Sequence, residues 1–333
     1  MYRLLRPLVF RLGPEDAHSY AIEAGKYLSG TPFRQVIDQT YNLKDKRLET
    51  EFCGINFPNP VGLAAGFDKN GELLDFLPSL GFGHIEIGSV TAKPSNGNPK
   101  PRIFRLPEYE SIINRMGLNN EGADAVYERL KNKKCKVPLG INIAKTNDKE
   151  ITGDSAIRDY CYTFRKMNDS ADYITLNISC PNTEDGRTFQ DKSALKELLS
   201  EIEINRRSGK RKPVLVKLSP DLTYGEIDRI LDISENYGIN GYVISNTTKS
   251  RDCLSSGEVG GVSGRCLKEK STEMIRYVNR QLKDPEIIGA GGIMTPDDAK
   301  EKMEAGAKLI QIYTGLIYRG PGLVKRINKG LLK

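Results

Sequence analysis

Eight short apolar runs, most of them rich in β-branched residues, recur along the chain from residue 59 to residue 316. Each run is apolar almost throughout and does not alternate with polar positions, which predicts strands buried on both faces of a parallel sheet. The predicted strands cover residues 59–66, 84–90, 138–144, 172–179, 213–219, 241–247, 286–293 and 309–316.

Segments with apolar residues at helical spacing fill most gaps between these runs, for example 121–133, 193–207, 223–237, 268–283 and 296–306. Eight strands that alternate with helices predict a closed (β/α)8 TIM barrel. An open doubly wound sheet is the competing fold, but no GxGxxG motif follows the first strand. The long connection 91–137, whose start is rich in Pro, Gly and Asn, predicts an excursion with its own small hairpin.

The first 44 residues show a different pattern. The stretch YRLLRPLVFRL mixes large apolar residues with arginines, and a helical pattern then opens at Pro14 and closes at Gly30 and Pro32. Such a basic, apolar helical hairpin can lie on a membrane surface or cap a domain, and the pattern alone favours neither. We therefore predict an N-terminal helical extension over residues 1–44 and a barrel domain over residues 45–333.

Composition adds limits to this picture. The chain has 333 residues, of which 38% are hydrophobic, and this suits one barrel with an appendage. A formal net charge of +7 fits anionic small molecules, an acidic membrane surface or nucleic acid. Six cysteines without a CxxC pair, and arginines that interrupt the N-terminal apolar residues, predict free thiols in a reducing cytoplasm. With only two histidines, we expect no metal site.

Glycines mark two of the strand ends where such barrels carry their functional groups. GAGG ends the seventh run, with Gly291 and Gly292, and Tyr313, Thr314 and Gly315 end the eighth. Glycine leaves backbone N–H groups unobstructed at the positions where these barrels bind phosphate. The sequence therefore predicts a cofactor that carries phosphate, with ordinary glycine turns as the alternative.

Polar side chains at other strand ends indicate the rest of the ligand. Lys217 would bring a positive charge into the barrel mouth, where it could stabilise a reduced, anionic flavin; as a structural residue it would need a buried carboxylate. Amides donate and accept hydrogen bonds, which suits a ring with carbonyl and N–H groups, such as a pyrimidine. Any single amide can be a turn residue, and only the set supports this interpretation: Asn114, Asn119, Asn142, Asn177, Asn182 and Asn246.

Cys180 in the stretch NISCPNT ends the fourth predicted strand, directly before Pro181. A buried, inert thiol is the usual role of a cysteine. Its position between Asn177 and Asn182 favours catalysis, and no histidine is near in sequence to form a nucleophilic pair with it. A thiol can act as a general base, so we interpret Cys180 as the group that removes a proton while hydride is transferred.

Nearly the whole chain resembles one family, the dihydroorotate dehydrogenases. The matching motifs occur in family order and include NPVGLAAGFDKNGE, INRMGLNN, NISCPNT, GGVSGRCLKEKSTE and QIYTGLIYRGPGLVKRI. The resemblance implies FMN in the barrel mouth. It also implies oxidation of dihydroorotate to orotate, a step of de novo pyrimidine synthesis.

The matching motifs also imply roles for single residues. Cys180 would remove the ring proton, and Lys69 would meet the substrate carboxylate. The implied substrate-binding residues are Lys69, Asn114, Arg115, Met116, Gly117, Leu118, Asn177, Asn182, Asn246 and Thr247. The implied flavin-binding residues are Ala65, Ser89, Asn142, Asn177, Lys217, Ser245, Gly264, Gly291, Gly292, Tyr313 and Thr314.

The N-terminus resembles the membrane-associated, quinone-dependent class 2 of this family, whose helical hairpin forms a quinone tunnel. This implies a quinone acceptor and peripheral contact with the cytoplasmic face of the cell membrane. Position 180 departs from that class, because cysteine belongs to the soluble class and serine is usual here. Ser89 and Ser245 stand where threonine is usual, and Glu184 and Asp185 add acids to a loop that usually lacks them. A cytoplasmic enzyme that uses fumarate or NAD is therefore the alternative.

Two further functions compete with this interpretation. The tRNA dihydrouridine synthases share FMN, the barrel and an Asn-x-x-Cys-Pro stretch, but they need an RNA-binding helical domain after the barrel. Only a short segment follows the eighth predicted strand, so we expect no nucleic-acid partner. A non-enzymatic phosphate-binding barrel would be colourless when purified, whereas a bound flavin would make the protein yellow.

Overall fold

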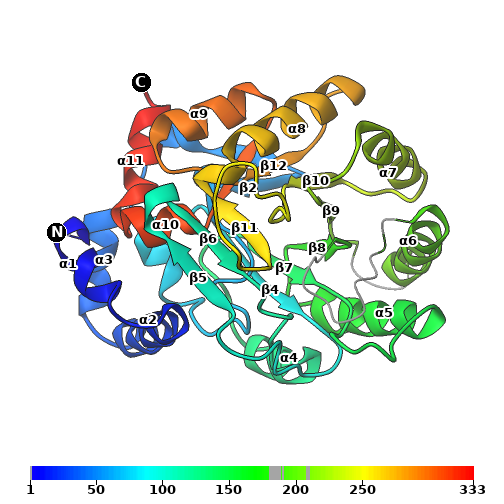
Figure 1. Cartoon of the computed structure of the whole chain (residues 1–333), viewed down its shortest axis with the longest axis horizontal. Coiled ribbons are helices and arrows are strands. Elements are labelled where there is room, and N and C mark those ends of the chain that lie inside the picture. Colours follow the sequence, from blue (N-terminus) through cyan, green and yellow to red (C-terminus); the bar gives the residue numbers. More distant parts are fainter. Residues whose placement is uncertain (1, 180–188, 190, 208–210) are drawn as a thin grey trace.

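Three helices open the chain in the computed structural model, which describes residues 2–179, 189, 191–207 and 211–333. They are α1 (Tyr2–Val9), α2 (Pro14–Ser29) and α3 (Phe33–Tyr41). In Figure 1 these helices lie at one side of the barrel, beside the C-terminal helices. The Tyr2 hydroxyl donates to the Ile317 carbonyl at 2.5 Å, so the two ends of the chain are joined directly.

Eight parallel strands form a closed barrel, as the apolar runs predict. The order around the barrel is β10-β12-β13-β3-β4-β7-β8-β9, and β13 pairs with β3 to close it. Almost every residue of these strands is buried, which is the burial expected where helices cover a parallel sheet. The strands are β3 (Val61–Leu63), β4 (His84–Val90), β7 (Leu139–Ile143), β8 (Tyr173–Asn177), β9 (Val214–Leu218), β10 (Gly241–Ile244), β12 (Ile287–Ala290) and β13 (Leu309–Ile312).

Helices surround the barrel (Figure 1). Two of them begin at a capping box, in which Thr223 pairs with Glu226 and Thr295 pairs with Asp298, and this satisfies N–H groups of the first turn. The helices are α4 (Ala123–Leu130), α5 (Asp154–Asn168), α6 (Lys192–Arg207), α7 (Tyr224–Asn236), α8 (Lys268–Gln281), α9 (Pro296–Glu304), α10 (Thr314–Arg319) and α11 (Gly322–Leu331). Short 3₁₀ turns are η1 (Lys46–Leu48), η2 (Leu77–Leu80), η3 (Pro107–Tyr109) and η4 (Arg265–Leu267).

A small sheet covers the carboxyl ends of the strands. The hairpin predicted within 91–137 is confirmed as β5 (Ile103–Leu106) and β6 (Ser111–Asn114), which pair antiparallel. A third strand, β11 (Gly261–Gly264), comes from the loop after β10 and pairs with β6. Two segments that are far apart in the sequence thus form one three-stranded sheet, β5–β6–β11, which we call the roof.

A second hairpin, β1 (Thr50–Phe52) and β2 (Ile55–Phe57), closes the opposite end. Phe52 and Phe57 have no exposed surface and pack against side chains near the beginnings of the barrel strands. These are Tyr173, Leu215, Val243, Ile288 and Leu309. The barrel is therefore accessible from its carboxyl end.

The prediction of free thiols is wrong for two of the six cysteines. Cys253 and Cys266 form a disulfide, because the loop after β10 returns across β11 and brings their Cα atoms to 5.6 Å. Cys53, Cys135 and Cys161 are free. Burial raises the pKa of Cys53 to about 12 and that of Cys135 and Cys161 to about 11, so these three thiols are poor nucleophiles.

His84 lies inside the barrel without polar partners. Its ring packs edge-on against Phe57 at 5.4 Å, and Gly62 on β3 leaves the space that the ring fills. Neither ring nitrogen has a hydrogen-bond partner among the described residues. Burial lowers the pKa of His84 to about 3, so the imidazole is neutral in the folded protein.

We expect this histidine to weaken the fold in acid. An unfolded histidine has a pKa of about 6.5, so the unfolded chain takes up a proton that the folded one excludes, and stability falls as the pH drops from about 6.5 toward 3. In urea unfolding, the free energy of unfolding of His84→Leu should therefore rise relative to that of the natural protein, by roughly 1.4 kcal/mol for each pH unit below about 6. A constant difference between the two proteins from pH 7 to pH 5 would contradict this expectation.

Candidate active site

A cavity of about 630 Å³ opens at the carboxyl ends of the barrel strands. Strand ends, the β5–β6–β11 roof and the first two helices all contribute to its wall. One part of the wall is polar and carries Lys69, Asn114, Asn119, Asn177, Lys217 and Asn246. The other part is apolar and includes Val9, Phe10, Leu12, Ala17, Ala21, Phe76 and Leu77.

Amide side chains form a connected network in the polar part. Asn246 Nδ2 donates to Asn177 Oδ1 at 3.1 Å, and Asn177 Nδ2 donates to Ser89 Oγ at 3.2 Å. Asn246 is also held by Ser179, whose carbonyl accepts from it at 3.2 Å. Neighbouring strand ends therefore place amide groups side by side, as the sequence predicts, and a ligand with ring carbonyl and N–H groups fits this surface.

Asn142 supports this network from behind. It is fully buried, and its Oδ1 accepts a hydrogen bond from Ser89 Oγ, which lines the cavity. Its Nδ2 donates to Glu86 Oε1 at 2.9 Å. Asn142 is thus not part of the cavity wall but fixes the orientation of a side chain that is.

Glu86 is a buried carboxylate that sequence reasoning missed. It has no exposed surface and accepts hydrogen bonds from Thr175 and Gln311, at 3.1 and 2.8 Å, in addition to Asn142. The signal was a single acid inside the apolar run HIEIGSV. It lies within β4 and not at a strand end, where catalytic groups of such barrels are expected.

Lys69 lies on the loop after β3, and that loop is anchored to β4. Asp68 accepts from the backbone N–H groups of Glu72 and Leu73 at 2.9 and 2.8 Å, and its carbonyl accepts from Gly88 N. The Lys69 ammonium donates to Asn119 Oδ1. Burial lowers the pKa of Lys69 to about 7; Arg102 lowers this pKa further, whereas Glu15 acts against the shift.

Glycines line the side of the cavity that faces α8. Gly264, Gly291 and Gly292 all have positive φ angles, of 97°, 109° and 74°. A Cβ atom at Gly292 would lie 2.5 Å from Lys268 Cα, and one at Gly264 would lie 2.4 Å from the Glu110 carbonyl oxygen. Only glycine fits these positions, which lie near the N-terminus of α8, where backbone N–H groups favour anions.

The cavity brings most of the predicted site residues together. The residues that line it are Ala65, Lys69, Ser89, Asn114, Met116, Gly117, Leu118, Asn177, Lys217, Ser245, Asn246, Thr247, Gly264, Gly291, Gly292, Tyr313 and Thr314. Arg115 does not belong to them. Its guanidinium pairs with Glu258 at 2.8 Å and stacks on Phe104, so it turns to the outer side of the roof. Cys180 and Asn182 lie outside the described residues.

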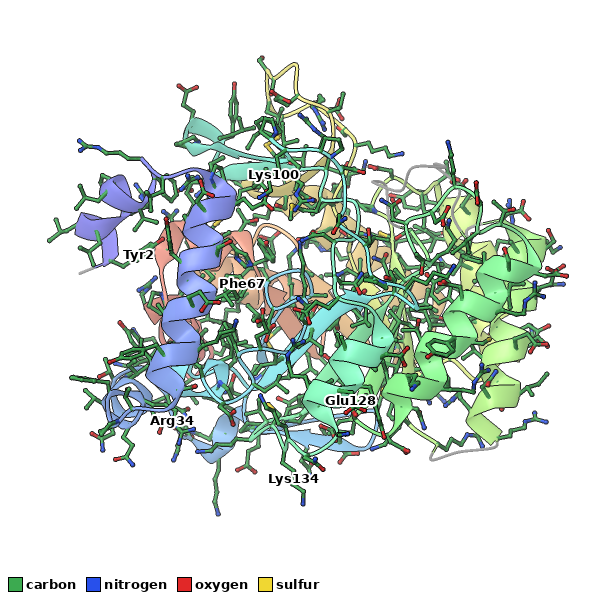
Figure 2. The ribbon with its side chains drawn as sticks, turned by 90° about the horizontal axis from the view of Figure 1, so that it is seen from below. Tyr2, Arg34, Phe67, Lys100, Glu128 and Lys134 are labelled. Atoms are coloured by element: carbon green, nitrogen blue, oxygen red, sulfur yellow. A yellow bond between two sulfur atoms is a disulfide. The ribbon has the colours of Figure 1, made fainter. Side chains whose placement is uncertain are left out.

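The apolar part of the cavity contains polar groups that the sequence did not single out. His18 on α2 contacts Phe67 edge-on at 5.0 Å, and Figure 2 shows Phe67 beside this helix. Burial, and to a lesser degree Lys69, lowers the pKa of His18 to about 4, so the ring is neutral at pH 7. Arg105 on β5 also lines the cavity and donates to the Val9 carbonyl at 3.3 Å.

Comparisons with known proteins identify the family of this chain. A family profile described as dihydroorotate dehydrogenase matches residues 47–333. Relatives named dihydroorotate dehydrogenase (quinone) include one from Natronomonas pharaonis, 43% identical over 100% of this chain and 94% of its own length. Another, from Legionella pneumophila strain Philadelphia 1, is 46% identical over 99% of both. The solved structure of a DHODH from Eimeria tenella in complex with ferulenol has a TM-score of 0.87 and 35% identity, over 96% of this chain and 90% of that one.

Proposed function

Because the chain belongs to the dihydroorotate dehydrogenase family, we propose that it oxidises dihydroorotate to orotate and passes the electrons to a quinone. This reaction is a step of de novo pyrimidine synthesis. The observation that carries the proposal is a single cavity whose wall combines polar, amide-bearing strand ends with an apolar section contributed by α1 and α2, which we call the apolar channel.

The family is flavin-dependent, and the residues of the cavity fit FMN. Gly264, Gly291 and Gly292 would hold its phosphate, and Lys217 would lie beside its ring system. Bound FMN would supply the chemistry of hydride acceptance and of electron transfer to the quinone. Lys217 is 7% exposed, and its ammonium would stabilise negative charge on the ring.

The substrate would lie against the amide network. Asn114, Asn177 and Asn246 would bind the ring carbonyl and N–H groups, and the Lys69 ammonium would pair with the carboxylate. Cys180, as thiolate, would take the proton from the carbon next to a ring carbonyl, while the neighbouring carbon loses hydride. Loss of one proton and one hydride gives the ring double bond of orotate.

The quinone would enter through the N-terminal helices. Most large apolar side chains that the described residues expose lie between residues 4 and 36, and Leu4 and Tyr27 are 81% and 75% exposed. Within the described part of the chain, no helix has the length and apolar character needed to cross a membrane. An exposed apolar helix surface beside Arg6 and Arg11 favours peripheral binding to the cytoplasmic face of a membrane, from which a quinone reaches the channel.

One experiment separates the possible acceptors. The purified yellow protein is reduced with dihydroorotate without oxygen, and quinone, fumarate and NAD are then offered separately. We expect rapid reoxidation by quinone alone. Reoxidation by fumarate or NAD would support a soluble acceptor, and no bleaching by dihydroorotate would exclude the proposed activity.

The pKa of Lys69 predicts how ligand binding depends on pH. Below pH 7 the ammonium is present and pairs with a carboxylate, and above it the free protein loses this charge. Orotate affinity should therefore be full below pH 7 and weaken as the pH rises above it. Lys69→Met should weaken orotate binding by about 100-fold near pH 7 and remove this pH dependence. Titration from pH 6 to 9 tests this, with the exposed Lys149→Met as control; parallel curves for all three proteins would disprove it.

A further inference from the structure

Lys302 is a lysine with no exposed surface, located on α9 behind the glycines of the cavity. Its aliphatic part reaches past Gly289 on β12, where an added Cβ atom would lie 3.5 Å from Lys302 Cδ. Its ammonium ends at the first turn of α8. There it donates to Ser271 Oγ at 2.6 Å, to Thr272 Oγ1 at 2.9 Å and to the Lys268 carbonyl at 3.3 Å.

All three of these partners are neutral oxygens. The nearby acids are paired with other cations, since Lys268 binds Asp298 at 2.8 Å and Glu301 at 2.9 Å, and Arg276 also contacts Glu301. Burial lowers the pKa of Lys302 to about 7; Lys268 and Arg276 act in the same direction, and Glu301 and Asp298 against it. The positive end of the α8 dipole adds to this excess of positive charge.

Ser271 connects this charge to the cavity wall. Its hydroxyl accepts from Lys302 and can give its one hydrogen to the Gly291 carbonyl, at 3.3 Å, or to that of Lys268, at 3.2 Å. Gly291 and Gly292 line the cavity, and Gly292 lies directly against Lys268. The ammonium is thus one hydroxyl away from the backbone that would hold a phosphate.

We propose that Lys302 is a positioning residue for the phosphate of the flavin: it fixes Gly291 and the first turn of α8 through Ser271, and its buried charge is balanced when a phosphate dianion binds. The proposal rests on the FMN site proposed above. A bound dianion favours the protonated ammonium, so the contribution of the phosphate to affinity should be full below pH 7 and decline as the pH rises above it.

Riboflavin, which lacks the phosphate, isolates this contribution. The full chain, freed of flavin, is titrated with FMN and with riboflavin between pH 7 and 9, and the ratio of the two dissociation constants is measured. The natural protein should prefer FMN, and this preference should shrink as the pH rises. Lys302→Met should reduce the preference by about tenfold or more at pH 7 and make it independent of pH.

A second substitution at Lys302 separates the charge from the hydrogen bonds, and a substitution at Lys300 serves as the control. Lys302→Gln keeps a hydrogen-bond donor without the charge, so it should lose the pH dependence even where Lys302→Met does not fold. Lys300→Met, on the exposed side of the same helix, should match the natural protein. An unchanged ratio at every pH in folded Lys302→Met or Lys302→Gln overturns the role of Lys302. A natural protein that binds neither flavin overturns the FMN site, and the role of Lys302 with it.

Discussion

Cys180→Ala should bind FMN and orotate but reduce its flavin with dihydroorotate about 10²–10⁴-fold more slowly, because the variant has no group to take the ring proton. Stopped-flow bleaching of the flavin without oxygen measures this step directly. Cys180→Ser should keep part of the activity and need a higher pH, since a serine hydroxyl is a much weaker acid than a thiol.

Cys53→Ala is a suitable control, because Cys53 follows β1 at the closed end of the barrel and its removal should leave flavin reduction unchanged. Near-normal reduction in Cys180→Ala would show that another group removes the proton. The role of Cys180 as base rests on the sequence motif alone, so this experiment tests it directly. Asn177, three residues before Cys180, belongs to the amide network of the cavity.

Filling the apolar channel should separate the two half-reactions. Ala17 on α2 lines the channel, and Ala17→Trp would occupy the space that a quinone needs. Quinone-dependent turnover should fall by about tenfold or more, which corresponds to about 1.4 kcal/mol in the barrier. Flavin reduction by dihydroorotate should stay within about twofold of the natural rate, because the amide network is untouched.

Ala24→Trp places the same side chain on an exposed position of α2 that does not line the cavity, and it should have no effect on turnover. Removing residues 1–44 should also impair quinone reduction and spare the first half-reaction. Since Glu15 binds Arg102 at 2.6 Å and Ile22 is buried in the core, the single substitution is the cleaner test. Full quinone turnover in Ala17→Trp would place the quinone elsewhere.

The sequence predicted the barrel well because its strands are buried on both faces, and continuous apolar runs report burial directly. Gly291 and Gly292 stood out in the GAGG stretch at the end of the seventh run, and their positive φ angles explain why glycine occupies both positions. The family motifs supplied the remaining strand-end residues, and the cavity confirms that most of them lie together. A pattern that is local in sequence was sufficient in each case.

Features that depend on distant partners could not be predicted in this way. β11 is paired through β6, and only the folded chain shows that these strands meet. Arg115 lies in a family motif, yet Glu258 and Phe104 attract its guanidinium to the outer side of the roof. Cys253 and Cys266 are joined by the path of a loop, which has no signature in their spacing.

The pairing of β3 with β13 determines when the active site can be completed during synthesis. Val61 and Ile310 become neighbours only after nearly the whole chain has left the ribosome, so the first strand of the barrel waits for the last. Tyr313 and Thr314 follow β13 directly and line the same cavity. If FMN binds as proposed, we expect its loading to be a late event, because a nascent chain that stops before β13 has an open sheet edge and lacks Tyr313 and Thr314.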